Sequence, residues 1–186
     1  MKHNHKITYA DITLRPIAEQ DLELLRTWRN DSQATTYLAK IPHITTEMQR
    51  QWFAKDQADS TAYTFAIVLT DTDELIGSVA VYNIADKQAE YGRIFIGNMK
   101  HRGRGLGFKA LASILFFAFE RLGVEKIVAH VYENNERAVS NNLVQGFVIV
   151  GKQFVDDATG YDLDIELSKA DFLSKFDFAT AINIER

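Results

Sequence analysis

A basic, glycine-rich segment at residues 98–107 has the composition of a phosphate-binding loop. Its glycines, Gly103, Gly105 and Gly107, let the backbone approach a ligand closely and direct N–H groups at it. A helix-forming apolar run follows, and the N-terminus of a helix favours an anion. Positive charge comes from Lys100, His101, Arg102 and Arg104. The segment predicts a site for a phosphorylated ligand, although a solvated loop at a helix entry has a similar composition.

The composition of the 186-residue chain favours work on small molecules in the cytoplasm. With 46% hydrophobic residues we expect one domain over residues 1–186, with 170–186 as a candidate appendage. A net charge of −4 argues against a nucleic-acid partner, which needs a basic face. The lack of cysteine excludes disulfides, a thiolate nucleophile and zinc-thiolate sites, and no metal site is expected. Neither a signal peptide nor an apolar run of about 20 residues occurs, so no membrane association is expected.

The elements that position the glycine-rich segment follow from hydrophobic periodicity. Strand-like patterns occur at residues 7–16, 63–69, 75–82, 89–97, 126–132, 147–155 and 161–167. Helical patterns occur at residues 19–30, from a capping box at Thr46 onward, at 107–122, and from Asn134 or Asn135 to Gly146. Short connections imply antiparallel strands, whereas the crossover helix at 107–122 implies one parallel pair. The predicted fold class is α/β (α+β by some schemes), with a mixed, mostly antiparallel central sheet and flanking helices.

The C-terminal tail carries Phe172, Phe176 and Phe178. An apolar tail of this kind either docks as a helix on the body or forms a contact between copies of the chain. The second arrangement would make the protein a homodimer, and the sequence leaves both open.

Two motifs lie on either side of the predicted parallel pair. The first is Arg102-Gly103-Arg104-Gly105-Leu106-Gly107, and the second is Asn135-Glu-Arg-Ala138 with Gly146-Phe147 at the end of its helix. With the order of elements, they resemble the Q/R-x-x-G-x-G/A and N-x-x-A signatures of the GNAT superfamily of acetyl-CoA-dependent N-acetyltransferases. The resemblance covers nearly the whole chain. It implies acetyl-CoA as cosubstrate and direct acetyl transfer to a primary amine, such as a protein N-terminus, an amino sugar or another small amine.

Softer cues concern the branch of the superfamily. Ile12-Thr-Leu-Arg-Pro16, Ala89-Glu-Tyr-Gly92 and Glu133-Asn-Asn-Glu-Arg-Ala138 resemble ribosomal-protein alanine acetyltransferases. Trp28-Arg-Asn30 with Gln51-Trp-Phe53 is similar to sugar-nucleotide amine acetyltransferases, such as those of pseudaminic acid biosynthesis. Two amphipathic helices that pack their tryptophans into the core would explain the last pair equally well. The acceptor is expected to depend on the loops at residues 28–42.

The resemblance also implies where the cosubstrate lies. The strand at residues 91–97 would splay from the strand at 126–132, and the pantetheine arm would occupy the gap as a substitute strand. Phe95, Ile96 and Gly97 would line that arm, with the Ile96 N–H polarising the thioester carbonyl. The pyrophosphate would bind the N–H groups of Arg102 to Gly107, and Asn135 would contact the arm.

The catalytic residues are also assigned by resemblance. An amine with a pKa around 10 must lose a proton before it attacks, and Glu90 aligns with the glutamate of an A-E-x-G segment that could act through water. An ordinary exposed carboxylate is the alternative for Glu90. Many members place a tyrosine, as the acid for the leaving thiolate, where this chain has Asn142, and an amide is not such an acid. Tyr132 is a replacement candidate, whereas His130 is more typical of a core or cleft-lining residue.

Two other function classes stay open at this point. Gly105-Leu-Gly-Phe-Lys-Ala110 also satisfies G-x-G-x-x-A, and Glu133 ends the next strand, as in a dinucleotide-binding oxidoreductase. The amide at Asn142 also suits a non-catalytic acyl-CoA-binding protein.

Overall fold

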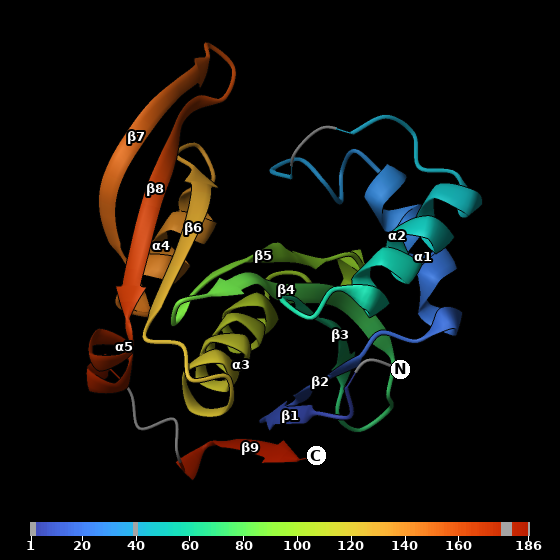
Figure 1. The fold of residues 1–186 in the computed structure, drawn as a ribbon. Helices are drawn as coiled ribbons and strands as arrows, with labels where there is room; N and C mark the ends of the chain where they lie inside the picture. The colour runs from blue at the N-terminus through green and yellow to red at the C-terminus, as the bar shows by residue number, and fades with distance from the viewer. Residues whose placement is uncertain (1–2, 39–40, 176–179, 186) are drawn as a thin grey trace.

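The computed structural model describes residues 3–38, 41–175 and 180–185, and a mixed sheet forms its centre (Figure 1). The strands are β1 (Lys6–Tyr9), β2 (Ile12–Pro16), β3 (Tyr63–Leu69), β4 (Leu75–Ala85), β5 (Gln88–Ile96), β6 (Lys126–Tyr132), β7 (Val148–Asp156), β8 (Gly160–Ser168) and β9 (Ile182–Glu185). The helices are η1 (Glu19–Asp21), α1 (Leu22–Asn30), α2 (Thr46–Ala58), η2 (Met99–His101), α3 (Leu106–Arg121), α4 (Glu136–Val144) and α5 (Lys169–Lys175). The strand order is β7-β8-β6-β5-β4-β3-β2-β1-β9. Neighbouring strands are antiparallel except β5 and β6, which confirms the predicted fold class.

Two hydrophobic clusters cover opposite faces of the sheet. Successive residues of β3 alternate between them, because Phe65 and Ile67 join the larger cluster and Ala66 joins the smaller one. The larger cluster includes α3, which is buried at every position from Ala110 to Phe119. The smaller cluster holds the apolar side of α1. Figure 1 shows α3 along one side of the sheet, with α1 and α2 grouped away from it.

A β-bulge in β5 moves its side chains from one face to the other. Arg93 has a φ of +53°, and the register with β4 shifts between the pairs Ser78–Phe95 and Ala80–Gly92. Tyr91, before the bulge, lies in the larger cluster, whereas Phe95, after it, lies in the smaller one. Because of the bulge, two side chains of β5 that are four residues apart point to opposite faces of the sheet instead of the same face.

The parallel pair separates soon after it begins. Only residues 88–90 of β5 pair with residues 126–128 of β6. Beyond them, β6 stands away from β5 with β7 and β8 (Figure 1). The predicted splay is confirmed, and it leaves the β6-facing edge of residues 91–96 outside the sheet pairing.

Two sequence-based boundaries need correction. Residues 7–16 form a hairpin rather than one strand, because Ala10 turns the chain with a φ of +53° and Ile7 pairs with Leu14. Alanine is rarely a turn residue, so the alternation of apolar and polar residues over 7–16 did not indicate a turn at Ala10. The N-cap of α2 is Thr45 rather than Thr46, since the Thr45 Oγ1 accepts from the Met48 N–H at 3.2 Å.

The C-terminal tail belongs to the body of the described structure. Phe172 of α5 is fully buried and packs on Phe119 of α3, with ring centroids 5.4 Å apart. Strand β9 pairs with β1 and extends the sheet. Phe176 and Phe178 lie outside the described residues. Of the two arrangements that the sequence left open, the helix that carries Phe172 therefore adopts the docked one.

In the described ranges, none of the helices has both the length and the apolar character needed to cross a membrane. Within the same ranges, no three histidine or acidic side chains gather as metal ligands would. The cytoplasmic location stays a prediction.

Candidate active site

Two cavities meet where β5 bulges and splays from β6. One, of about 740 Å³, is bounded by the glycine-rich segment and the start of α3, and we call it the glycine-loop cavity. The other, of about 770 Å³, lies against α1, α2 and the centre of the sheet, and we call it the arginine cavity because Arg29 and Arg93 line it. The residues common to both linings are Tyr37, Leu38, Tyr91, Ile94, Phe95, Asn135 and Ala138. The two cavities thus form one cleft with a shared middle.

The glycine-loop cavity is shaped mainly by backbone. Gly103 and Gly105 have φ values of +84° and +75°, a region that disfavours other residues. Gly105 is the N-cap of α3, and it supplies no side-chain hydrogen bond to the first turn. The first N–H groups of α3 therefore lack a side-chain cap and lie at the positive end of the helix dipole.

The space beside Gly107 is open. Gly107 lies in the first turn of α3, where glycine costs about 1 kcal/mol relative to alanine. A Cβ at this position would meet no atom within 4 Å, so packing does not require glycine there. The room and the uncapped amides together fit a pyrophosphate.

The two arginines of the loop have different surroundings. Arg102 donates to three carbonyl oxygens, those of Ile96 at 2.9 Å and of Gln33 and Ala34 at 3.0 Å. Arg104 is exposed, and its Nη1 donates to the His101 Nδ1 at 2.9 Å. Arg102 therefore ties the glycine-rich loop to the segment after α1, while Arg104 remains on the surface near the cavity.

The other residues predicted to bind the cosubstrate lie near the shared middle, with one exception. Phe95 lines both cavities and Ile96 lines the glycine-loop cavity. Asn135 also lines both, and its Oδ1 caps α4 by accepting from the Ala138 N–H at 3.2 Å. Gly97 instead packs under Trp28, where a Cβ would lie 2.2 Å from a ring carbon.

Asn142 forms a buried pair with Tyr91, which the sequence did not single out. The Tyr91 hydroxyl donates to the Asn142 Oδ1 at 2.5 Å, and the Asn142 Nδ2 donates to the Ala138 carbonyl at 2.8 Å. Asn142 is only 2% exposed. Burial raises the pKa of Tyr91 far above its usual value, so the phenol stays protonated. Both polar ends of the Asn142 amide are therefore hydrogen-bonded within the protein, one of them to Tyr91, which lines both cavities.

Two of the remaining catalytic candidates, Tyr132 and His130, line the arginine cavity, whereas Glu90 does not. Half-buried Glu90 lines neither cavity but pairs with Tyr82, whose pKa is raised by burial and then by the Glu90 charge. Tyr132 lines the arginine cavity alone. His130 also lines it, as a cleft residue, and its Nδ1 lies 2.9 Å from the Asp164 Oδ1. The structure therefore adds His130 to the groups that could accept a proton.

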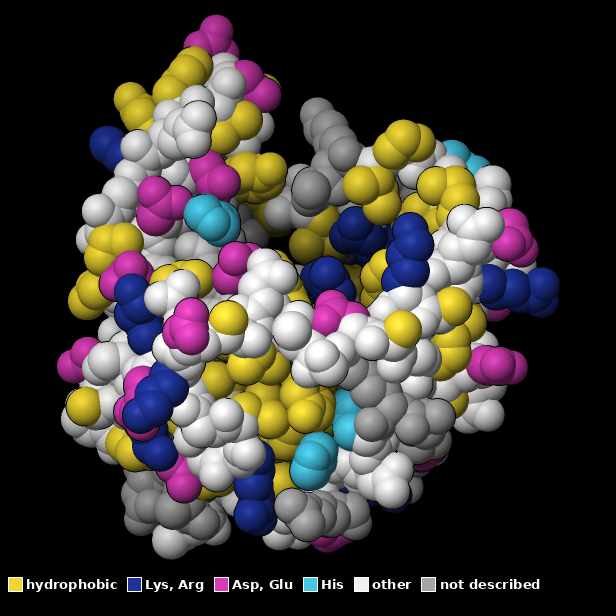
Figure 2. All heavy atoms as spheres, in the orientation of Figure 1, with side chains coloured by type: hydrophobic (Ala, Val, Ile, Leu, Met, Phe, Trp, Pro, Cys, Tyr) yellow, Lys and Arg dark blue, Asp and Glu magenta, His cyan; other side chains and the backbone are white. Residues whose placement is uncertain are grey.

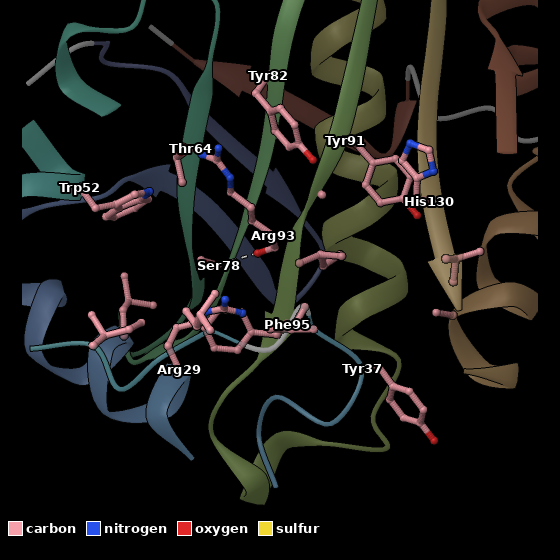
Figure 3. A pocket seen from close by; sticks show the side chains of 18 of the residues that line it. Arg29, Tyr37, Trp52, Thr64, Ser78, Tyr82, Tyr91, Arg93, Phe95 and His130 are labelled. Atoms are coloured by element: carbon pink, nitrogen blue, oxygen red, sulfur yellow. Dashed lines mark hydrogen bonds between the residues drawn. The ribbon is translucent and has the colours of Figure 1, made fainter. Parts of the chain in front are cut away.

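The arginine cavity holds two cationic side chains that sequence reasoning missed. Figure 3 shows Arg29 and Arg93 at its wall, the second extending from β5 toward Thr64. Burial, followed by the nearby Arg93 charge, lowers the pKa of Arg29. Figure 2 shows Lys and Arg side chains inside the hollow between the two halves of the molecule. Arg29 belongs to the Trp28-Arg-Asn30 segment, but nothing along the chain indicates that its side chain meets Arg93, because one residue lies on a helix and the other at a bulge.

Comparisons with known proteins agree with this geometry. The profile of the acetyltransferase (GNAT) domain matches residues 11–141. The acetyltransferase PseH of Campylobacter jejuni is 30% identical over 131 residues, which are 69% of this chain and 79% of that protein. The uncharacterized N-acetyltransferase YoaA of Bacillus subtilis is 27% identical over 162 residues, 83% of this chain and 90% of that protein. A spermidine N-acetyltransferase from Vibrio cholerae, solved with CoA and spermine, shares the fold at a TM-score of 0.79 and 22% identity, covering 88% of this chain and 99% of that one.

The domain match covers most of the chain and includes both sequence motifs apart from Gly146-Phe147. A dinucleotide-binding oxidoreductase and a non-catalytic acyl-CoA-binding protein find no support in these comparisons. The chain therefore belongs to the GNAT acetyltransferase family, and it is an N-acetyltransferase that takes its acetyl group from acetyl-CoA.

Proposed function

We propose that the protein transfers the acetyl group directly to the primary amine of a small molecule that binds in the arginine cavity. The observation that carries this proposal is the shared middle of the two cavities at Tyr91 and Phe95. A thioester reaching that point from the glycine loop would meet an amine reaching it from the opposite side. A cavity of about 770 Å³ lies within the usual range for small-molecule sites, which favours such an acceptor over a protein N-terminus.

Backbone groups are proposed to hold the donor. The uncapped amides of α3 and the loop at Gly103 and Gly105 would bind the pyrophosphate, and the unpaired edge of β5 would receive the pantetheine arm. The NH₂ group of Asn135 has no partner among the described residues and would donate to the arm. Acetyl-CoA supplies the acetyl group as a thioester. We retain the Ile96 N–H as the proposed donor to the developing oxyanion.

The transfer needs a proton acceptor and no enzyme nucleophile. The amine nitrogen forms a bond to the acetyl carbon, the C–S bond breaks, and the amine proton must leave. We propose Glu90 as the base, acting through water or the Tyr82 hydroxyl, because Glu90 itself lines neither cavity. His130 is the second candidate, since its contact with Asp164 through Nδ1 leaves Nε2 for an amine.

The departing thiolate takes up a proton, which we assign to water or Tyr132. Tyr91 is a weaker choice because its hydroxyl already donates to Asn142. We assign Asn142 a positioning role, since its amide bonds to Tyr91 and Ala138.

The test is amine-dependent release of free CoA from acetyl-CoA across a panel of amino sugars, amino acids, polyamines and peptides. We expect turnover of at least one small amine, and a Glu90→Gln variant with kcat lowered roughly 100-fold at an unchanged KM for acetyl-CoA. Glu125→Gln, which removes an exposed carboxylate, is the matched control. A kcat loss in His130→Asn but not in Glu90→Gln would transfer the role of base to His130. Failure of every amine to release CoA would refute the proposed function.

A further inference from the structure

Arg29 is a cation without a counter-charge in the wall of the arginine cavity. It is partly buried on α1, and among residues 3–38, 41–175 and 180–185 it makes no ion pair or hydrogen bond. Burying part of a guanidinium costs free energy unless an anion or hydrogen-bond acceptor compensates. Its pKa is lowered by that burial and by Arg93, which is the signature of a charge that the protein itself does not balance.

Arg93 reaches the same cavity and is only partly balanced. Its guanidinium lies 4.6 Å from the centre of the Tyr82 ring. Its Nη1 is 3.8 Å from the Asp56 Oδ1, and that carboxylate also accepts from the Thr64 hydroxyl at 2.5 Å. The side chain of Arg93 nevertheless remains 45% exposed. Arg93 can therefore contact a ligand while Asp56 holds it in place.

Few acidic groups face these two arginines. Asp162 is the one carboxylate among the described lining residues, and it lies on β8, across the cleft from α1. The closest ion partner of His130 is Asp164, outside this lining. A polyamine would bring further positive charge to a wall that already has a surplus. An acceptor with a negative group would instead balance Arg29.

We propose that Arg29 and Arg93 form a subsite for an anionic group of the acceptor, so that the preferred substrates are primary amines that carry a phosphate or carboxylate. The inference rests on the proposed function, because it describes the acceptor side of the same cleft. The anion binds beside α1 and the bulge of β5, while the amine extends toward Tyr91 and Phe95. Planar guanidinium groups suit both phosphate and carboxylate, so the shared chemistry is the anion.

The experiment compares glucosamine 6-phosphate with glucosamine and spermidine as acceptors at saturating acetyl-CoA. For the wild type, we expect kcat/KM to be roughly 10- to 100-fold higher with the phosphorylated amine than with glucosamine, because one or two charge-assisted hydrogen bonds are gained. Glycine serves as the carboxylate-bearing amine, so the panel distinguishes the two kinds of anion. A wild-type preference for spermidine, or equal rates with glucosamine and its phosphate, would overturn the subsite while leaving acetyl transfer established.

The variants identify the residue responsible. Arg29→Gln should abolish the preference for the phosphorylated amine, because kcat/KM should fall more with the phosphorylated amine than with glucosamine. Arg50→Gln, an exposed arginine on α2 outside the cavity, should retain the preference. An Arg29→Gln enzyme with an intact preference would refute the assignment.

A binding measurement decides the matter if none of these amines is acetylated. Glucose 6-phosphate is titrated by calorimetry into the protein saturated with CoA, so that the glycine loop is already filled. Binding to the wild type that weakens roughly 10-fold or more in Arg29→Gln supports the subsite. Equal binding to both proteins, or none to either, contradicts it, and circular dichroism checks that each variant is folded.

Discussion

The two halves of the cleft are built from different parts of the chain. Part of the lining of the glycine-loop cavity comes from one continuous segment, from His101 to Leu111, which supplies backbone N–H groups and the dipole of α3. The arginine cavity is lined by α1, α2, the segment between these two helices, β3 to β6, the start of α4 and β8, and its ionisable side chains include Arg29, Arg93 and His130. In the proposed function the glycine-loop cavity binds the donor and the arginine cavity binds the acceptor, so a family can retain the first while its members differ in the second. The loop motif identifies acetyl-CoA and carries little information about the amine.

The largest test of this contrast enlarges Gly107. A Gly107→Leu variant keeps a helix-compatible residue whose Cβ meets no protein atom, so the melting temperature should be unchanged or slightly raised. Its side chain would occupy the space for the pyrophosphate, and loss of about two charge-assisted hydrogen bonds should raise the KM for acetyl-CoA roughly 100-fold. Gly107→Ala, within the G/A pattern of the loop, should stay within a few-fold. Steady-state kinetics with acetyl-CoA as the varied substrate checks both, and a normal KM in the leucine variant would remove Gly107 from the phosphate site.

The second test concerns the wall that both cavities share. Tyr91→Phe leaves the Asn142 Oδ1 buried without its donor, so the free energy of unfolding should fall by about 1–3 kcal/mol, as measured in urea. The KM values for acetyl-CoA and for the amine should both rise, because Tyr91 lines both cavities. Tyr91→Phe combined with Asn142→Leu should recover part of the stability. A change in only one KM would assign Tyr91 to one half of the cleft.

The third and smallest test compares neighbouring arginines of the loop. Arg102→Ala breaks the link to the Gln33 and Ala34 carbonyls, so both the acetyl-CoA and the amine KM should rise about 10-fold, as expected for the loss of one or two net hydrogen bonds. Arg104→Ala removes only a surface charge beside the loop and should raise the acetyl-CoA KM about 3-fold. Equal effects of the two substitutions would show that Arg102 acts as another phosphate contact rather than as a connection between the halves.

Much of the fold followed from local patterns, and the errors have local causes. The crossover helix, the parallel pair and an N-cap at Asn134 or Asn135 were predictable because periodicity and capping act over a few residues, and the structure places the cap at Asn135. The hairpin at Ala10 was missed because its turn residue is atypical. The bulge at Arg93 was missed because nothing in the sequence of β5 distinguishes a strand that continues from one that changes faces.

The sequence by itself determined the family and the glycine-rich loop that opens into α3. This loop is recognisable along the chain because the glycines that adopt positive φ and the helix that follows them are consecutive in sequence. Only the tertiary structure decided the lining of the arginine cavity and the contact between Asn142 and Tyr91. Arg29, Arg93 and Asp56 meet because α1 and α2 pack on the sheet beside the bulge of β5, and Tyr91 meets Asn142 because α4 packs beside the same strand. Side chains brought together from distant segments leave no pattern along the chain, because their contacts depend on how the helices pack on the sheet.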